Sequence, residues 1–239
     1  MPRRPRRQQW TEAACYHLIN RGHNRETVFA NDDDRRYFLD LIDRYRQRYD
    51  LRLFHYCLMS NHFHLLLQVR KCEHLSPLMA GLLRSYVHYF NRQCGFVGHL
   101  WQGRFRSPAI QAESYLLSCG RYIERNPLDA QLVERPWDYA WSSCRHYALG
   151  EPNERLTPDP YYLELGPEPS QRQERWRQFL LDADPKEEAI LRQGWVLGDQ
   201  DLARQTANRY GRPGGRSAGR PRGSKGAISS QPKLAIGEK

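Results

Sequence analysis

Apolar residues recur at two different spacings along the first half of the chain, and the spacing separates predicted helices from predicted strands. Phe38, Leu41 and Tyr45 return every three or four residues, which is the repeat of an amphipathic helix. The polar run at 31–34 precedes them with a capping side chain and with carboxylates that suit the positive end of a helix dipole. The pattern predicts a helix that begins in this run and ends at Asp50.

Runs rich in β-branched, aromatic and other apolar residues predict strands. Such runs lie at 13–21, 51–60, 62–70 and 104–112. The second and third runs meet at Ser60-Asn61, a pair that suits a tight turn, so we expect these two strands to form a hairpin.

Two more helices complete the predicted pattern. One begins at Ser76 and closes near Gly95, and the other covers 113–126. We expect Pro127 to stop the second helix, because the residue before a proline resists helical geometry. The order strand, helix, strand, strand, helix, strand is a split βαβ pattern. The expected fold class is therefore α+β, a ferredoxin-like antiparallel sheet with packed helices.

The pattern weakens after about residue 150. Prolines mark an irregular linker, 171–181 and 185–192 have the composition of short amphipathic helices, and from Tyr210 onward Gly, Pro, Ser and Arg leave no apolar face to bury. We therefore predict four parts: a basic arm at 1–10, a folded domain at 11–150, a linker and helical extension at 151–209, and a disordered basic tail at 210–239.

The formal net charge of +10 suggests a polyanionic partner, but the charge is concentrated at the two ends. Residues 1–10 carry +4 and residues 206–239 carry +7, which leaves −1 for 11–205. Basic tails are often only solvated, so charge alone does not decide between a nucleic-acid partner and none.

Hydropathy and cysteine spacing exclude several classes of protein. The mean hydropathy is −0.84, and no apolar run is long enough to cross a bilayer, so we expect no membrane partner. The basic N-terminus lacks the apolar stretch of a secretory signal, so we expect a cytoplasmic protein. Six cysteines without CxxC spacing indicate reduced thiols rather than a zinc ribbon or a disulfide framework.

Candidate chemistry begins with the segment Asn61-His62-Phe63-His64. Residues two apart on a strand point to the same face, so His62 and His64 project together and are able to share one divalent ion. This pattern also fits two hydrogen-bonded histidines. The apolar run that follows indicates a buried strand, where imidazoles need partners.

A second candidate pair lies in the third predicted helix. Tyr122 and Asn126 are four residues apart, so a phenol and an amide share one helical face. The same residues also fit a core aromatic and a helix-end amide. Trp101, Arg104 and Arg106 mix an aromatic ring with guanidinium groups in a way that suits stacked bases and phosphates.

Together these segments resemble the REP-associated tyrosine transposases, a branch of the single-tyrosine HUH nucleases that includes the transposases of small insertion sequences. The resemblance covers about residues 10–150. It rests on Asn20-Arg21-Gly22, Asp32-Asp33-Asp34-Arg35-Arg36, Asn61-His62-Phe63-His64, Trp101-Gln102-Gly103-Arg104, Tyr122-Ile123-Glu124-Arg125-Asn126-Pro127 and Trp141-Ser142-Ser143.

The resemblance implies a role for each residue of the two pairs. Tyr122 would be the nucleophile that forms a 5′-phosphotyrosine intermediate, with His62, His64 and Asn126 as ligands of Mg²⁺ or Mn²⁺. Imidazole ligands by themselves favour Zn²⁺ or Mn²⁺, so the choice of ion rests on the resemblance. Tyr115 is the rival nucleophile, since seven residues bring it back to nearly the same helical face.

The resemblance also implies a single-stranded DNA substrate, a repetitive extragenic palindrome that forms a hairpin. The expected contacts on the DNA are Trp101, Arg104, Arg106 and Arg121, with Arg3, Arg4, Arg6 and Arg7 of the basic arm as a clamp. The Arg-Pro segments near 212 and 220 fit either a minor-groove hook or a flexible solvated tail.

Two other function classes fit the sequence. A ferredoxin-like sheet also serves as a non-catalytic nucleic-acid-binding module, which would leave both histidines idle. A metal-dependent hydrolase that uses water would not need Tyr122. The sequence leaves open whether the protein acts as a monomer or as a dimer.

Overall fold

A computed structural model describes residues 14–95, 98–110 and 113–182, with only the backbone described at 113–115. The predicted arm at 1–10, the predicted helix at 185–192 and the predicted tail at 210–239 lie outside these residues. No helix in the described part is both long enough and apolar enough to cross a membrane.

The core of the fold is a four-stranded antiparallel sheet with the order β2-β3-β1-β4. Its elements occur along the chain in the predicted order of strand, helix, strand, strand, helix, strand. This order confirms the split βαβ pattern and the α+β, ferredoxin-like fold class. The bounds are β1 Cys15–Arg21, α1 Asp32–Tyr49, β2 Leu51–Met59, β3 His62–Val69, α2 Leu75–Cys94, β4 Ala109–Ile110 and α3 Glu113–Asp129.

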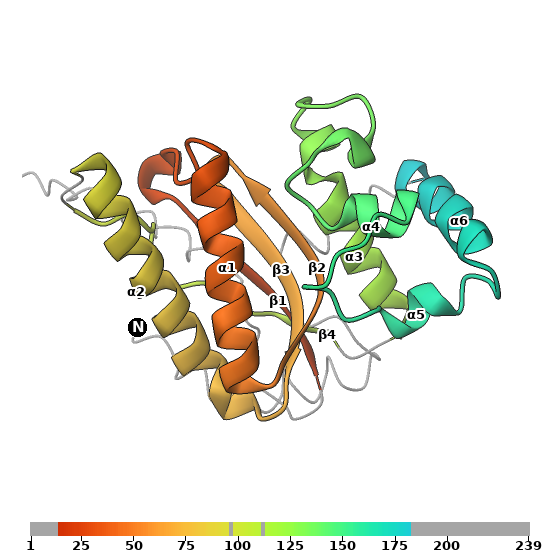
Figure 1. Ribbon diagram of the computed structural model, residues 1–239, viewed down its shortest axis with the longest axis horizontal. Coiled ribbons are helices and arrows are strands. Elements are labelled where there is room, and N and C mark those ends of the chain that lie inside the picture. The colour runs from red at the N-terminus through yellow and green to blue at the C-terminus, as the bar shows by residue number, and fades with distance from the viewer. Residues whose placement is uncertain (1–13, 96–97, 111–112, 183–239) are drawn as a thin grey trace, which may run out of the picture.

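Helices cover both faces of the sheet, as Figure 1 shows: α1 and α2 lie side by side on one face, and α3 lies on the other. Residues beyond α3 add the helices α4 (Cys144–Leu149), α5 (Pro160–Leu163) and α6 (Pro169–Leu181), next to α3. Short 3-10 turns occur at η2 (His23–Arg25), η3 (Cys72–His74) and η4 (Pro136–Asp138). The helix predicted at 171–181 is thus confirmed as α6.

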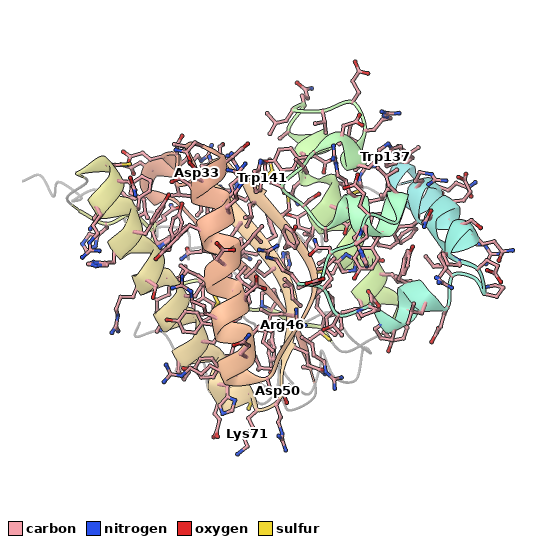
Figure 2. All side chains as sticks on the ribbon, in the orientation of Figure 1. Asp33, Arg46, Asp50, Lys71, Trp137 and Trp141 are labelled. Carbon is pink, nitrogen blue, oxygen red and sulfur yellow. The ribbon has the colours of Figure 1, made fainter. Side chains whose placement is uncertain are left out.

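Helix α1 begins in the polar run at 31–34, as predicted. Asn31 Oδ1 accepts a hydrogen bond from Asp34 N at 3.0 Å, and Asp34 Oδ2 accepts one from Asn31 N at 3.3 Å. This reciprocal capping box satisfies two backbone donors that have no partner inside the helix. Asp50 ends the helix in the left-handed conformation, and Figure 2 labels Asp33 and Asp50 at its two ends.

Most of the described part of the predicted strand 104–112 is irregular. Among the described residues, only Ala109 and Ile110 pair continuously with β1. Upstream, contact with β1 is reduced to isolated bridges, because Pro108 has no backbone donor and Gly103 adopts a φ of +153°. The loop 98–108 therefore follows the edge of β1 as irregular chain.

A buried polar network attaches the C-terminal helices to α3. Glu124 Oε1 lies 2.8 Å from His55 Nδ1 and 2.6 Å from Ser143 Oγ, while Glu124 Oε2 accepts from Trp176 Nε1 at 2.9 Å. On its other side His55 Nε2 lies 3.1 Å from Asp159 Oδ2. All five residues are buried, so residues beyond 150 complete the surroundings of a helix that carries candidate site residues.

Candidate active site

The two predicted histidines lie on the face of the sheet that α3 covers. Residues alternate along β3, so Phe63 packs into the core under α1 and α2 while His62 and His64 face the other way. Their ring centroids are 5.0 Å apart. His64 is buried, at 3% exposed, and His62 is half-buried at the end of the strand.

Hydrogen bonding determines which nitrogen of His62 holds its proton. Asn61 Nδ2 donates to Arg25 O at 3.1 Å, so Asn61 Oδ1 is the amide atom that faces His62 Nδ1, at 2.6 Å. A carbonyl oxygen only accepts, so Nδ1 must be the donor. In the neutral ring, Nε2 then has the free electron pair.

His64 has a partner that the sequence interpretation missed. His17 Nε2 lies 2.8 Å from His64 Nδ1, and the two rings stack with centroids 5.1 Å apart. His17 comes from β1, the strand next to β3, and is 1% exposed. Period-two alternation within 13–21 places His17 on one face, but that signal does not reveal which strand lies alongside.

Helix α3 brings Tyr122 to the same place. The Tyr122 ring lies edge-on to His64 and His17, with centroid separations of 5.6 Å and 5.8 Å, and is 8% exposed. The side chain of Asn126, one turn further along the helix, lies beside His62 and interacts with it. The shared helical face predicted for Tyr122 and Asn126 therefore meets the histidine pair.

The expectation that Pro127 stops the helix is wrong. Helix α3 continues to Asp129 with Pro127 inside its last turn. Proline lacks the N–H that would bond Ile123 O, and Asn126 Nδ2 fills that place by donating to Ile123 O at 3.3 Å and to Tyr122 O at 2.6 Å. Because Nδ2 serves these carbonyls, Oδ1 is the amide atom that remains for His62.

All three imidazoles are held in the neutral form. Burial lowers the pKa of His17 to about 3 and that of His62 to about 4, and it lowers the pKa of His64 well below its usual value. The guanidinium groups of Arg106 and Arg21 add to the effect. Neutral imidazole is the form that binds a metal ion, and the two arginines favour an anionic ligand nearby.

The donor atoms fit a divalent cation. Within the described ranges, no group of three or more His, Cys, Asp or Glu side chains is placed to hold a metal ion. A cation here would instead use the two imidazoles of His62 and His64 with the amide oxygen of Asn126. Nε2 of the neutral His62 ring and Oδ1 of Asn126 each have an electron pair that a cation would accept.

Comparison with known proteins indicates one family that this sequence resembles. The family model described as IS200-like transposase matches residues 11–126, a stretch that ends at Asn126 and includes Tyr122 and both histidines. This match confirms the resemblance to the IS200-like transposase family that the sequence motifs indicate. The match supports the predicted class of function, a transposase with a DNA partner.

A solved structure of a REP-associated tyrosine transposase bound to a REP hairpin is similar to this protein. Its TM-score is 0.52 at 17% sequence identity, and the match covers 66% of this chain and 92% of that chain. At this identity the likeness shows a shared fold. No curated protein matches the sequence.

Three of the predicted DNA contacts, Trp101, Arg104 and Arg106, lie on the loop 98–108, which runs along the edge of β1. Arg104 and Arg106 are exposed there, and the Arg106 backbone pairs with Ile19. The Trp101 ring packs against Phe63 and Tyr86 on the α2 side of the sheet, so only part of it is accessible. Trp101 Nε1 is buried without a hydrogen-bond partner in the described structure.

The fourth predicted contact, Arg121, does not lie on an open surface. It is 3% exposed, donates through Nη1 to Asp182 O at 2.8 Å, and places its guanidinium 4.0 Å from the ring centroid of Phe179. Arg125 Nη1 donates likewise to Leu180 O. These arginines bind the carbonyl end of α6, where cations are favoured. The side chain of the rival nucleophile Tyr115 lies outside the described residues.

Proposed function

We propose that this transposase cleaves single-stranded hairpin DNA with Tyr122 as the nucleophile, through a 5′-phosphotyrosine intermediate. The observation that carries the proposal is the position of the Tyr122 ring, within 6 Å of two imidazole rings that are buried and neutral. A tyrosine in a core made only for packing would not need three histidines beside its face of the helix.

The chemistry follows from the phenol. Tyr122 Oη forms a bond to phosphorus while the bond from phosphorus to the 3′ oxygen breaks, so the energy of the phosphodiester is kept in the phosphotyrosine link. The phenolic proton passes to water and the leaving oxygen takes one up as it becomes a 3′ hydroxyl. A later hydroxyl is then able to rejoin the strand without ATP.

His62, His64 and Asn126 would hold the divalent cation, Mg²⁺ or Mn²⁺. When bound, such an ion offsets the charge that builds on the non-bridging phosphate oxygens during attack. Asn61 orients the His62 ring, and the hydrogen bonds to Tyr122 O and Ile123 O orient the Asn126 amide. These contacts would hold the two ligand groups in place in the absence of the ion.

The substrate we propose is a hairpin with unpaired DNA beside it, because the scissile phosphate must reach a site between a sheet and a helix. The transposase of similar fold is itself bound to a REP hairpin. Arg106 is exposed and near enough to lower the pKa of His17 and His64, and Arg104 is exposed on the same loop. Both would contact phosphates, which predicts affinity that falls as salt rises.

Covalent trapping tests the proposal. Purified protein is incubated with end-labelled single-stranded hairpin DNA and Mn²⁺ or Mg²⁺, then denatured, and the DNA-linked peptide is identified by mass spectrometry. We expect an adduct on Tyr122 that is lost in Tyr122→Phe while hairpin binding survives. Tyr115→Phe is the matched control and should keep the adduct.

The other outcomes identify the competing functions. Cleavage that persists in Tyr122→Phe would indicate a hydrolase that uses water. Intact DNA under all conditions, with binding preserved, would indicate a non-catalytic nucleic-acid-binding protein.

A second comparison tests the proposed ligands. His62→Ala should reduce metal-dependent cleavage far more than hairpin binding, whereas the same change at the exposed His88 of α2 should alter neither. Parallel losses of cleavage and binding in His62→Ala would mean that His62 has a structural role.

A further inference from the structure

The buried His17 is the one imidazole of the cluster that the proposed function leaves without a role. It comes from β1 rather than from the histidine pair on β3, and it lies 47 residues from His64 in the chain. Its Nε2 meets His64 Nδ1 at 2.8 Å, with both rings almost fully buried. This contact determines which ring nitrogen of His64 has a free electron pair for a cation.

We propose that His17 is a positioning residue: it accepts a hydrogen bond from His64 Nδ1 and so leaves His64 Nε2 as the atom that binds the cation. This inference rests on the proposed function, in which His64 is a ligand.

Proton positions support the proposal. A short contact between two neutral imidazole nitrogens needs one proton, which belongs either to His64 Nδ1 or to His17 Nε2. In the second case the neutral His64 has its proton on Nε2, where a cation would need the electron pair. A bound cation therefore selects the first case, with His17 as the acceptor.

The arrangement around His62 supports the same interpretation independently. There Asn61 Oδ1 accepts from Nδ1, as the bond from Asn61 Nδ2 to Arg25 O requires. Both candidate ligands thus have Nδ1 engaged by a neighbour, and both are left with Nε2. Outer hydrogen bonds of this kind set ring orientation and ligand strength in metal sites.

His17 also borders the nucleophile. Its ring meets the Tyr122 ring edge-on with centroids 5.8 Å apart, and that of His64 meets Tyr122 at 90° with centroids 5.6 Å apart. The stacked pair of imidazoles therefore forms a wall against which Tyr122 packs. A shift of His17 would move the proposed ligand and the phenol together.

Mn²⁺ binding to the protein without DNA tests the proposal. Free Mn²⁺ is measured by electron paramagnetic resonance for the wild type, His17→Gln and His17→Leu, with thermal unfolding and metal-free hairpin binding as controls. Glutamine retains an acceptor near the position of Nε2, whereas leucine fills space without one. We expect His17→Leu to weaken Mn²⁺ binding about 10- to 100-fold, and His17→Gln to stay within a few-fold of the wild type.

Equal Mn²⁺ affinity in His17→Leu and the wild type would overturn the proposal, and so would equal weakening in both variants. A measurement on the wild type covers the case in which a variant does not fold. Two-bond ¹H–¹⁵N spectra with diamagnetic Mg²⁺ should show the His64 proton on Nδ1, and a proton on Nε2 would refute the assignment.

His64→Ala separates this inference from the proposed function. If His64→Ala leaves Mn²⁺ affinity unchanged, His64 is not a ligand and the metal site of the proposed function fails as well. If His64→Ala weakens binding and His17→Leu does not, the metal site stands and only the role of His17 is refuted.

Discussion

The buried network around His55 makes a quantitative prediction about pH and stability. His55 lies between two carboxylates, with Nδ1 2.8 Å from Glu124 Oε1 and Nε2 3.1 Å from Asp159 Oδ2, and all three side chains are fully buried. Both ring nitrogens face acceptors, so the doubly protonated imidazolium is favoured. Although burial opposes the charge, the two carboxylates outweigh it and raise the pKa of His55 to about 9.

The sign of the effect follows from that raised pKa. The folded protein holds the His55 proton more tightly than the unfolded chain, so the stabilisation is complete below the unfolded pKa of 6.5 and is lost as pH rises through 9. Because His55 is fully buried, the rise from 6.5 to about 9 corresponds to a free energy of about 3 kcal/mol.

Urea unfolding at pH 6.5 and pH 9.5 tests this value in the wild type and in His55→Gln. The wild type should lose about 3 kcal/mol more stability across this range than the variant, because other titrating groups affect both proteins alike. At pH 6.5 the variant should be less stable by about 3 to 5 kcal/mol, since it leaves two buried carboxylates without their cation. Equal pH slopes in the two proteins would refute the reasoning.

Three further predictions concern positions around the site. A Cβ at Gly120 would lie 2.7 Å from His55 Nε2, so Gly120→Ala should cost about 1 to 3 kcal/mol in urea unfolding, and an unchanged midpoint would contradict this. Asn31→Ala removes the capping box with Asp34 and should lower the melting temperature by about 2 to 4 °C; no shift would show that the cap adds nothing. Arg121→Met should cost about 1 to 2 kcal/mol of stability, while the salt dependence of hairpin binding stays the same; a shallower slope would restore its role as a DNA contact.

Local pattern was sufficient for most elements and for two pairs of site residues. The capping run before α1 and the hairpin at Ser60-Asn61 are properties of neighbouring residues. The same is true of the shared faces of His62 with His64 and of Tyr122 with Asn126, because a strand repeats every two residues and a helix about every 3.6. Such periodicity is present in the sequence before the chain folds.

Local pattern failed where a side chain found a hydrogen-bond partner that propensity and charge do not describe. The helix was expected to end before Pro127, yet the side chain of Asn126 fills the hydrogen bond that proline leaves open. Arg121 carries the charge of a DNA contact, but Phe179 of α6 packs against it, and Asp182 at the end of α6, 61 residues later, accepts its hydrogen bond. Charge and propensity describe what a residue is able to do, while packing determines which partner it meets.

What the sequence by itself determined is the set of elements, the fold class and the residues that share a face of one element. Tertiary structure alone decided the register of β1 against β3, in which His17 meets His64. It also decided that Glu124 binds both His55, 69 residues before it, and Trp176, 52 residues after it. The physical reason is that strand order and layer packing arise from burying the whole apolar surface at once. No spacing within a single element records which element will be its neighbour.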